Sequence, residues 1–192
     1  MRDEELVGLY ERAGALLHGH FVLRSGLHSG RYLQSALLLA RPELAARAGD
    51  ALADLVRESR PAAVLSPALG GVIIGHETAR ALGVRFLFAE REGGDFALRR
   101  GFRLESREPL AVVEDVVTTG GAVLRMIRLA EEAGAEVRAV GALVDRSRGK
   151  ALFPVPFHPV ARLSIETFPP ERCPLCREGI PIEKPGSGRV HA

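Results

Sequence analysis

The fold of this chain is decided by the stretch Val112-Val113-Glu114-Asp115-Val116-Val117-Thr118-Thr119-Gly120-Gly121-Ala122-Val123. The apolar run at residues 110–113 contains β-branched side chains and predicts a buried strand. Good helix formers fill residues 122–130 and Gly134 follows them, which predicts a helix. A buried strand, a glycine-containing loop and a helix form the repeating unit of a mainly parallel sheet.

The loop between this strand and this helix has unusual chemistry for a connection. Glu114 and Asp115 close the strand, where two carboxylates are costly unless something binds them, and a sugar diol or a hydrated Mg²⁺ would suit. Residues 118–121 supply two hydroxyls and a run of backbone N–H groups at a helix N-terminus, which favours bound phosphate. The loop is therefore predicted to bind a ribose 5′-phosphate.

The same loop has a simpler interpretation as a strand end, a helix cap and a tight turn. It lacks the Gly-Lys-Ser/Thr ending of a P-loop, which disfavours a nucleoside triphosphatase. The whole string of apolar residues, two acids, two apolar residues, Thr-Thr-Gly and a small residue resembles the phosphoribosyl pyrophosphate (PRPP) motif of the type I phosphoribosyltransferases. Every position from 112 to 123 fits that motif.

Length, composition and charge exclude several classes of protein. The chain has 192 residues, 46% of them hydrophobic and 26% charged, which is enough for one globular core or one core with a small lobe. The net charge of +2 is too small to indicate nucleic-acid binding, and no stripe of basic residues is visible. No apolar run reaches the length of a membrane span, and residues 1–5 lack the features of a signal peptide. We expect a cytoplasmic protein that contacts neither nucleic acid nor membrane.

The remaining segments predict strands that alternate with helices in one domain, 1–192. The expected helices lie at residues 3–17, 43–58 and 72–82, and the expected strands at residues 62–65, 84–89, 137–144 and 161–165. Residues 21–39 read as extended segments broken by two Ser-Gly pairs, which predicts a hairpin. The fold class is α/β, with a doubly wound, mainly parallel sheet flanked by helices. The predicted parts are an N-terminal helix and hood (1–40), a core (41–167) with a flap (90–102), and an irregular C-terminal tail (168–192).

Other candidate site residues lie in three further segments. Ser-Pro-Ala-Leu-Gly-Gly at residues 66–71 joins a strand to a helix and is a second place for an anion. Arg146 lies at the end of a strand, where the ligands of parallel sheets gather, so it is well placed to meet an acidic substrate. The hood collects polar and aromatic residues that would suit a lid over a flat, charged base: Arg24, Ser25, His28, Arg31 and Tyr32.

The two cysteines lie in the tail as Cys-Pro-Leu-Cys. Cys173 and Cys176 have the spacing of half of a four-ligand zinc site, and the tail contains no second half. A second chain in a dimer, or His158 or His191, would complete such a site.

Several segments together resemble the orotate phosphoribosyltransferases. They are Phe-x-Leu-x-Ser-Gly-x-x-Ser-x-x-Tyr at 21–32, Ser-Pro-Ala-Leu-Gly-Gly at 66–71, Phe-Ala-Glu-Arg-Glu at 88–92, the central motif, and Val-Asp-Arg at 144–146. The resemblance covers roughly residues 18–148. It implies transfer of ribose 5-phosphate from PRPP to orotate in pyrimidine synthesis, with Mg²⁺ as cofactor and a homodimer as the assembly. It also implies that one peptide bond of the 66–71 loop is cis.

The resemblance further implies roles for single residues. Those expected to bind PRPP are Glu114, Asp115, Val116, Val117, Thr118, Thr119, Gly120, Gly121, Ala122, Leu69, Gly70, Gly71 and Arg91. Those expected to bind orotate are Thr118, Arg146, Arg24 and Tyr32, and those expected to act in catalysis are Asp115, Arg99 and Arg100. Mg²⁺ is expected to reach the protein through PRPP and water, without a direct side-chain ligand. No nucleophilic side chain is required, because the substrate nitrogen attacks an oxocarbenium-like carbon.

The flap departs from the pattern of the family. The mobile loop of the family usually carries lysines and a histidine that reach the pyrophosphate, often in the neighbouring subunit, and this chain has none at 90–102. Arg91, Arg99 and Arg100 either form a solvated edge of a hairpin around the Gly-Gly-Asp turn or replace those lysines. Two alternative functions share the central motif: a type I phosphoribosyltransferase for a purine base, and a non-catalytic regulator that senses PRPP or a nucleotide.

Overall fold

The computed structural model describes residues 1, 3–23 and 25–185. Within these residues the strands form a six-stranded sheet, in the order β5-β4-β3-β6-β7-β8, and a separate β1-β2 pair. The strands are β1 (Leu16–Val22), β2 (His28–Leu33), β3 (Ala63–Pro67), β4 (Arg85–Glu92), β5 (Asp95–Leu98), β6 (Pro109–Val117), β7 (Glu136–Asp145) and β8 (Phe157–Arg162). The helices are α1 (Asp3–Arg12), α2 (Ser35–Leu39), α3 (Pro42–Val56), α4 (Gly70–Leu82), α5 (Gly121–Glu132) and α6 (Pro174–Arg177), with short 3₁₀ turns η1 (Arg57–Ser59) and η2 (Pro170–Arg172).

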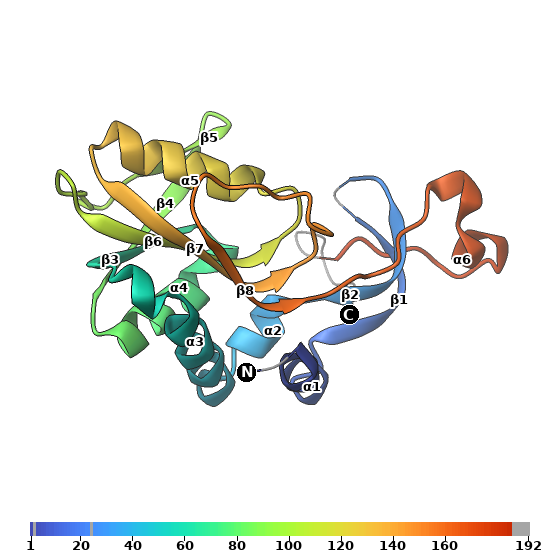
Figure 1. Ribbon diagram of the computed structural model, residues 1–192. Helices are drawn as coiled ribbons and strands as arrows, with labels where there is room; N and C mark the ends of the chain where they lie inside the picture. The colour runs from blue at the N-terminus through green and yellow to red at the C-terminus, as the bar shows by residue number, and fades with distance from the viewer. Residues whose placement is uncertain (2, 24, 186–192) are drawn as a thin grey trace.

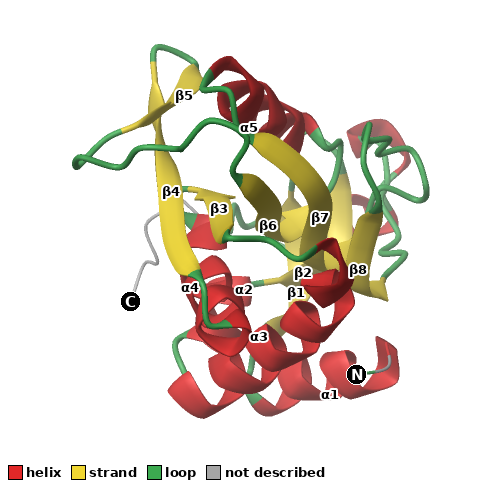
Figure 2. Ribbon diagram, turned by 60° about the vertical axis from the view of Figure 1, so that its left-hand side comes forward, coloured by secondary structure: helices red, strands yellow, loops and turns green. Residues whose placement is uncertain are grey.

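The large sheet has helices on both faces, which confirms the predicted fold class. All its neighbouring strands are parallel except the β4–β5 hairpin. Helices α3 and α4 pack on one face, against β3, β6, β7 and β8, while α5 packs on the other (Figures 1 and 2). The apolar stripe of α5, with Val123, Met126, Ile127 and Ala130 buried, explains why this segment is a helix that lies on the sheet.

The β1–β2 pair forms the hood, which projects from the large sheet on the same side as the C-terminal tail (Figure 1). The helix predicted at 3–17 is present as α1, but its predicted C-terminal end was wrong. Helix α1 ends at Arg12 because Gly14 takes a left-handed conformation, φ +65°, and the N–H of Ala15 donates to the carbonyl oxygen of Tyr10 at 2.7 Å. Leu16 and Leu17 therefore belong to β1. The end of the predicted extended region, 35–39, is instead the short helix α2.

The C-terminal part also differs from the prediction. The last strand of the sheet is β8, earlier in the chain than the predicted 161–165, because Phe157 already pairs with Val140 of β7. The tail is more regular than predicted: it contains η2 and α6, and isolated bridges join Phe168 to His28 and Glu183 to Phe21. These partners lie in the hood, so the local pattern of the tail could not reveal them.

Among the described residues, no helix combines the length and the apolar character needed to cross a bilayer.

Candidate active site

The central loop lies at the carboxyl end of β6. The strand extends through the two acids to Val117, further than predicted, and Glu114 is buried while Asp115 is partly exposed. Gly120, with φ +79°, then leads into α5, and a Cβ there would lie 3.0 Å from Cε1 of Phe153. Both the conformation and the lack of space require glycine at this position. Because the first N–H groups of a helix have no acceptor within it, the loop suits the predicted phosphate role.

A second loop meets the first at Asp115. Strand β3 ends at Pro67, the peptide bond between Ala68 and Leu69 is cis as the resemblance implied, and α4 begins at Gly70. A Cβ on Gly70 would lie 2.8 Å from Oδ1 of Asp115, and one on Gly71 would lie 3.1 Å from the carbonyl oxygen of Val113. Glycine at both positions therefore lets the backbone of this loop approach the acidic motif. The two predicted anion sites are neighbours at the carboxyl edge of the sheet.

Arg146 and Tyr32 come to the same edge from β7 and the hood. Arg146 follows the last residue of β7, and its N–H donates to the carbonyl oxygen of Val117 at 2.8 Å. Burial raises the pKa of Tyr32, the negative charge of Asp115 raises it further, and the positive charge of Arg146 lowers it. Burial also lowers the pKa of the Arg146 guanidinium, which the phenol of Tyr32 partly offsets. The fields of Asp115 and Arg146 thus act on one phenol, so the three predicted residues gather at one place.

Glu114 is the most perturbed carboxyl of the motif. Burial raises the pKa of Glu114 well above its ordinary value of 4.5, the neighbouring Asp115 raises it further, and Arg91 opposes the shift. The N–H of Asp115 donates to Oε1 of Glu114 at 3.3 Å. Glu114 therefore keeps its proton to higher pH than an exposed carboxyl does, which reduces the repulsion between the paired acids.

This perturbation predicts a stability change for Glu114→Gln. A group with a raised folded-state pKa favours the folded state below its unfolded pKa, and that contribution is lost as the pH rises through the folded pKa. We expect the free energy of unfolding of Glu114→Gln minus that of the wild type to be larger at pH 7 than at pH 4. Urea titrations of both proteins at the two pH values measure this. An equal difference at both pH values would contradict the shift.

The flap is the β4–β5 hairpin. Gly93 and Gly94 form its turn with positive φ angles of 56° and 93°, as the Gly-Gly-Asp sequence predicted. Arg99 is ion-paired with Glu92, and Nε of Arg100 lies 2.8 Å from Oε1 of Glu90. Sequence reasoning missed both carboxylate partners. They lie on β4, and the β4–β5 hairpin turns the chain back so that Arg99 and Arg100, just after β5, come near them.

Arg91 differs from the other two flap arginines. Its guanidinium lies 5.0 Å from the ring centroid of Phe96, and its charge lowers the pKa of Glu114. Arg91 is thus the flap arginine whose charge reaches the central motif within one chain.

Other candidates lie elsewhere. Arg24 falls outside the described residues. His28, one of the hood residues expected to suit a lid, is buried, and its Nδ1 lies 2.9 Å from Nε2 of His20. His158 does not join the cysteines, because it lies in β8 opposite Gly141, and His191 falls outside the described residues.

Sequence reasoning also underrated Tyr10 of α1. Its buried hydroxyl lies 2.9 Å from Oγ of Ser35, and Asp115 contributes to raising its pKa. Its place in the apolar period of α1 had suggested only packing.

Comparison with known proteins identifies the family. No protein-family model matches the chain. The chain is 50% identical over 185 residues to the orotate phosphoribosyltransferase of Carboxydothermus hydrogenoformans, with 95% of this chain and 97% of the relative covered. It is 51% identical over 179 residues to that of Thermotoga maritima, with 93% and 96% covered. The crystal structure of orotate phosphoribosyltransferase from Aeropyrum pernix matches with a TM-score of 0.72 at 28% identity, over 82% of this chain and 93% of that one. A chain that shares about half of its residues with such relatives, over nearly its whole length, belongs to the orotate phosphoribosyltransferase family.

Proposed function

We propose that this enzyme transfers ribose 5-phosphate from PRPP to orotate, giving orotidine 5′-phosphate and pyrophosphate, at the carboxyl edge of β3, β6 and β7. The observation that carries the proposal is the convergence of the two loops on Asp115, with Gly70 close enough that a Cβ would lie 2.8 Å from its carboxylate. A diphosphate on one loop and a ribose phosphate on the other would then be held as parts of one PRPP molecule. The family membership supports the same chemistry.

PRPP is proposed to lie along the two loops. Residues 118–122 would bind the 5′-phosphate through hydroxyls and backbone N–H groups, and Glu114 and Asp115 would accept hydrogen bonds from the ribose hydroxyls. Residues 69–71 would bind the pyrophosphate through backbone amides. Leu69 is 87% exposed, so its side chain does not cover this part of the loop.

Orotate is proposed to lie between the hood and the end of β7. Arg146 would donate two parallel hydrogen bonds to the carboxylate of orotate, while Tyr32 would cover the flat ring. The partial burial of Arg146 strengthens such a contact, since the surrounding dielectric is low. Thr118 would adjoin the base from the phosphate loop.

Magnesium fits this arrangement as a partner of PRPP. In the part of the chain that the structure describes, no third histidine, cysteine or acidic side chain lies close enough to Glu114 and Asp115 to complete a metal site with them. Mg²⁺ prefers to keep several waters and to bind phosphate oxygens with one or two carboxylates, so Asp115 beside residues 69–71 is where it would contact the protein through water. When bound, it neutralises charge on the leaving pyrophosphate.

The residues then act by position and charge. As the bond from the ribose carbon to pyrophosphate breaks, N1 of orotate forms the new bond to that carbon. Pyrophosphate leaves with the electron pair of the broken bond, and the proton of N1 passes to the departing pyrophosphate or to water. Glu114 and Asp115 hold the ribose where its carbon gains positive character, and Arg146 aims N1 by fixing the carboxylate. No covalent intermediate with the protein is needed.

We further propose a homodimer in the cytoplasm that contacts neither nucleic acid nor membrane. The net charge of +2 supports the lack of nucleic-acid contact. Cys173 and Cys176 are not joined by a disulfide, which suits a reducing compartment.

A base-exchange assay tests the function against its alternatives. With PRPP and Mg²⁺, we expect consumption of orotate and little of adenine or xanthine. The names of the relatives at about half identity favour orotate over a purine. Turnover of a purine in preference to orotate would favour the first alternative, and PRPP binding without turnover of any base would favour the regulator.

Asp115→Asn is expected to lower kcat at least tenfold, equivalent to about 1.4 kcal/mol in the barrier. The amide keeps the shape of the side chain but removes the charge that faces the ribose and residues 69–71. Steady-state kinetics measure the effect, with Asp54→Asn as a control, because Asp54 is an exposed acid of α3 that pairs with Arg57. Unchanged kinetics in a folded Asp115→Asn protein would remove the ribose role.

A further inference from the structure

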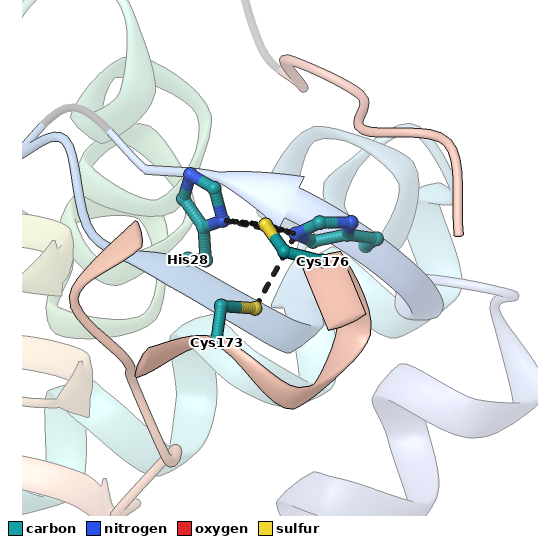
Figure 3. Close-up of side chains that lie close together, drawn as sticks. His28, Cys173 and Cys176 are labelled. Atoms are coloured by element: carbon teal, nitrogen blue, oxygen red, sulfur yellow. Dashed lines mark hydrogen bonds between the residues drawn. The ribbon is translucent and has the colours of Figure 1, made fainter. Parts of the chain in front are cut away.

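Two histidines of the hood and two cysteines of the tail meet in one cluster. His20 lies in β1 and His28 at the start of β2. Cys173 immediately precedes the short helix α6, and Cys176 lies within it. His20, His28 and Cys173 are buried, and Cys176 closes the cluster toward solvent. Figure 3 shows the side chains of His28, Cys173 and Cys176 pointing toward one another. The four possible ligand atoms all lie within 4.8 Å of one another.

The separations match a tetrahedral metal site. Zinc bonds of about 2.0–2.3 Å to nitrogen and sulfur place neighbouring ligand atoms roughly 3.3–3.8 Å apart. Nε2 of His20 lies 3.5 Å from Sγ of Cys173 and 3.7 Å from Sγ of Cys176, and Nδ1 of His28 lies 3.3 Å from Sγ of Cys176. The two ring nitrogens are closer, at 2.9 Å, which is a hydrogen-bond distance. Entry of an ion requires this pair to widen by roughly half an ångström, while the remaining ligand atoms already lie within 4.8 Å of one another.

The second nitrogen of His20 already has the partner that a metal-bound histidine needs. Nδ1 of His20 lies 2.8 Å from the carbonyl oxygen of Ile180, so Nδ1–H donates to it. That bond fixes the tautomer and leaves the lone pair of Nε2 directed at the cluster. Hydrogen bonds of this kind orient the histidines of metal sites.

We propose that His20, His28, Cys173 and Cys176 bind one structural Zn²⁺ within a single chain. On binding, the two thiols release their protons to solvent, and the proton on Nδ1 of His28 moves to Nε2. Two thiolates and two neutral imidazoles then balance the charge of the ion, so no net charge is buried. Two sulfur and two nitrogen ligands in a closed tetrahedral set favour zinc over Mg²⁺ or Ca²⁺, which prefer oxygen.

The ion would fasten the tail to the hood. Around the cluster, the N–H of Glu183 donates to the carbonyl oxygen of His20 at 2.7 Å, and His28 and Phe168 exchange two backbone hydrogen bonds of 2.8 Å. A two-stranded sheet is marginal by itself, and small units of this size often rely on a metal. His28 shares β2 with Tyr32, the residue proposed to cover the base. Zinc would thus hold the hood in place over the orotate site without taking part in the reaction.

Metal content of the untagged full-length chain tests the proposal directly. Elemental analysis after dialysis is expected to give about one zinc per chain. Cys176→Ser is the main variant, because that side chain is exposed and its loss disturbs packing least, and it is expected to lower zinc content at least tenfold. His18→Gln is the matched control: His18 is an exposed histidine of β1 outside the cluster, and it should leave zinc content unchanged.

Two further measurements remain informative if the variant folds poorly. Wild-type protein stripped of metal under reducing conditions and reloaded with Co²⁺ should show the absorption of a tetrahedral ion with thiolate ligands. Removal of zinc should also lower the Tm and raise the Kd for orotate more than that for PRPP. The zinc and cobalt readouts need no turnover, so they stand or fall separately from the proposed reaction.

Three results would overturn the proposal. The first is a reduced wild-type chain that takes up neither zinc nor cobalt, which would make the cluster a hydrogen-bonded contact. The second is a native protein whose mass is lower than that of the reduced chain by two hydrogens, because Cys173 and Cys176 form a disulfide. The third is zinc content that Cys176→Ser leaves unchanged.

Discussion

Replacing Arg99 and Arg100 together by glutamine is expected to lower kcat at least a hundredfold, with little loss of stability. Pyrophosphate leaves with several negative charges, while residues 69–71 offer amides but no cation of their own. Removing one preorganised donor from such a developing charge typically costs about 10²–10³ in kcat. Steady-state kinetics and thermal unfolding of the double variant measure the two effects.

The present partners of these arginines allow the movement that this role requires. Arg99 and Arg100 pair with Glu92 and Glu90 of the same hairpin, and both guanidinium groups are exposed. Exposed ion pairs contribute little to stability, so exchanging a carboxylate for a diphosphate is easily favourable. Gly93 and Gly94 at the turn provide the flexibility for closure, which would also exclude water that hydrolyses PRPP.

A matched control is available at the opposite edge of the sheet. Arg57 and Arg138 are also exposed arginines paired with carboxylates, Asp54 and Glu136, but they lie near the starts of β3 and β7. The double variant Arg57→Gln/Arg138→Gln should keep wild-type kcat. An equal loss of kcat in this control and in the flap variant would show a general effect of charge.

Mixed dimers decide whether the flap acts in the neighbouring subunit, as we predict. One subunit carries Asp115→Asn and the other carries Arg99→Gln/Arg100→Gln. A flap that acts on the partner leaves one site of each mixed dimer fully wild-type, whereas a flap that acts on its own chain leaves a defect in both sites. Activity no better than that of the mutant homodimers would exclude action across the dimer.

Arg146→Ala is expected to lower kcat/KM for orotate roughly 10–150-fold, chiefly through KM. This corresponds to about 1.5–3 kcal/mol, the usual contribution of a charge-assisted contact, and it applies because Arg146 is partly buried beside Tyr32. The KM for PRPP should change little, since the 5′-phosphate and diphosphate are bound by other loops.

Two companion variants sharpen this test. Arg146→Lys keeps the charge but loses the planar, two-pronged geometry, so its kcat/KM should lie between those of the wild type and Arg146→Ala. Arg128→Ala removes an exposed arginine from α5 and should have little effect. A rise in the KM for PRPP alone in Arg146→Ala would show that the residue serves the other substrate.

The central motif could be predicted from sequence because its determinants are neighbours along the chain. Apolar β-branched residues, two acids, Thr-Thr-Gly and helix formers follow one another, so strand, loop and helix each depend on local preferences. The alternation of such units predicted the parallel sheet, and parallel strands bring their carboxyl ends to one edge. The shared edge of Asp115, residues 69–71 and Arg146 was therefore within reach of sequence reasoning.

The ends of helices and strands were predicted less well than their positions, as the end of α1 shows. The apolar period of α1 continues through Leu16 and Leu17, but these residues pair with Leu33 and Tyr32 of β2. Whether a leucine continues a helix or enters a strand depended on a partner strand that the helical pattern does not contain. In the flap, likewise, the arginines were visible in the sequence, but only the folding of the hairpin decided that Glu90 and Glu92 pair with them.

The sequence by itself determined the fold class, the two phosphate loops and the likeness to a family, all of which depend on residues close together in the chain. Only the tertiary structure decided what completes the Cys-Pro-Leu-Cys pair. Cys173 lies 153 positions from His20 in the sequence. Sequence reasoning had named His158 and His191 as possible further ligands, and not His20. The physical reason is that a metal site needs four atoms at one point in space, and no local periodicity records which distant strands the tail packs against.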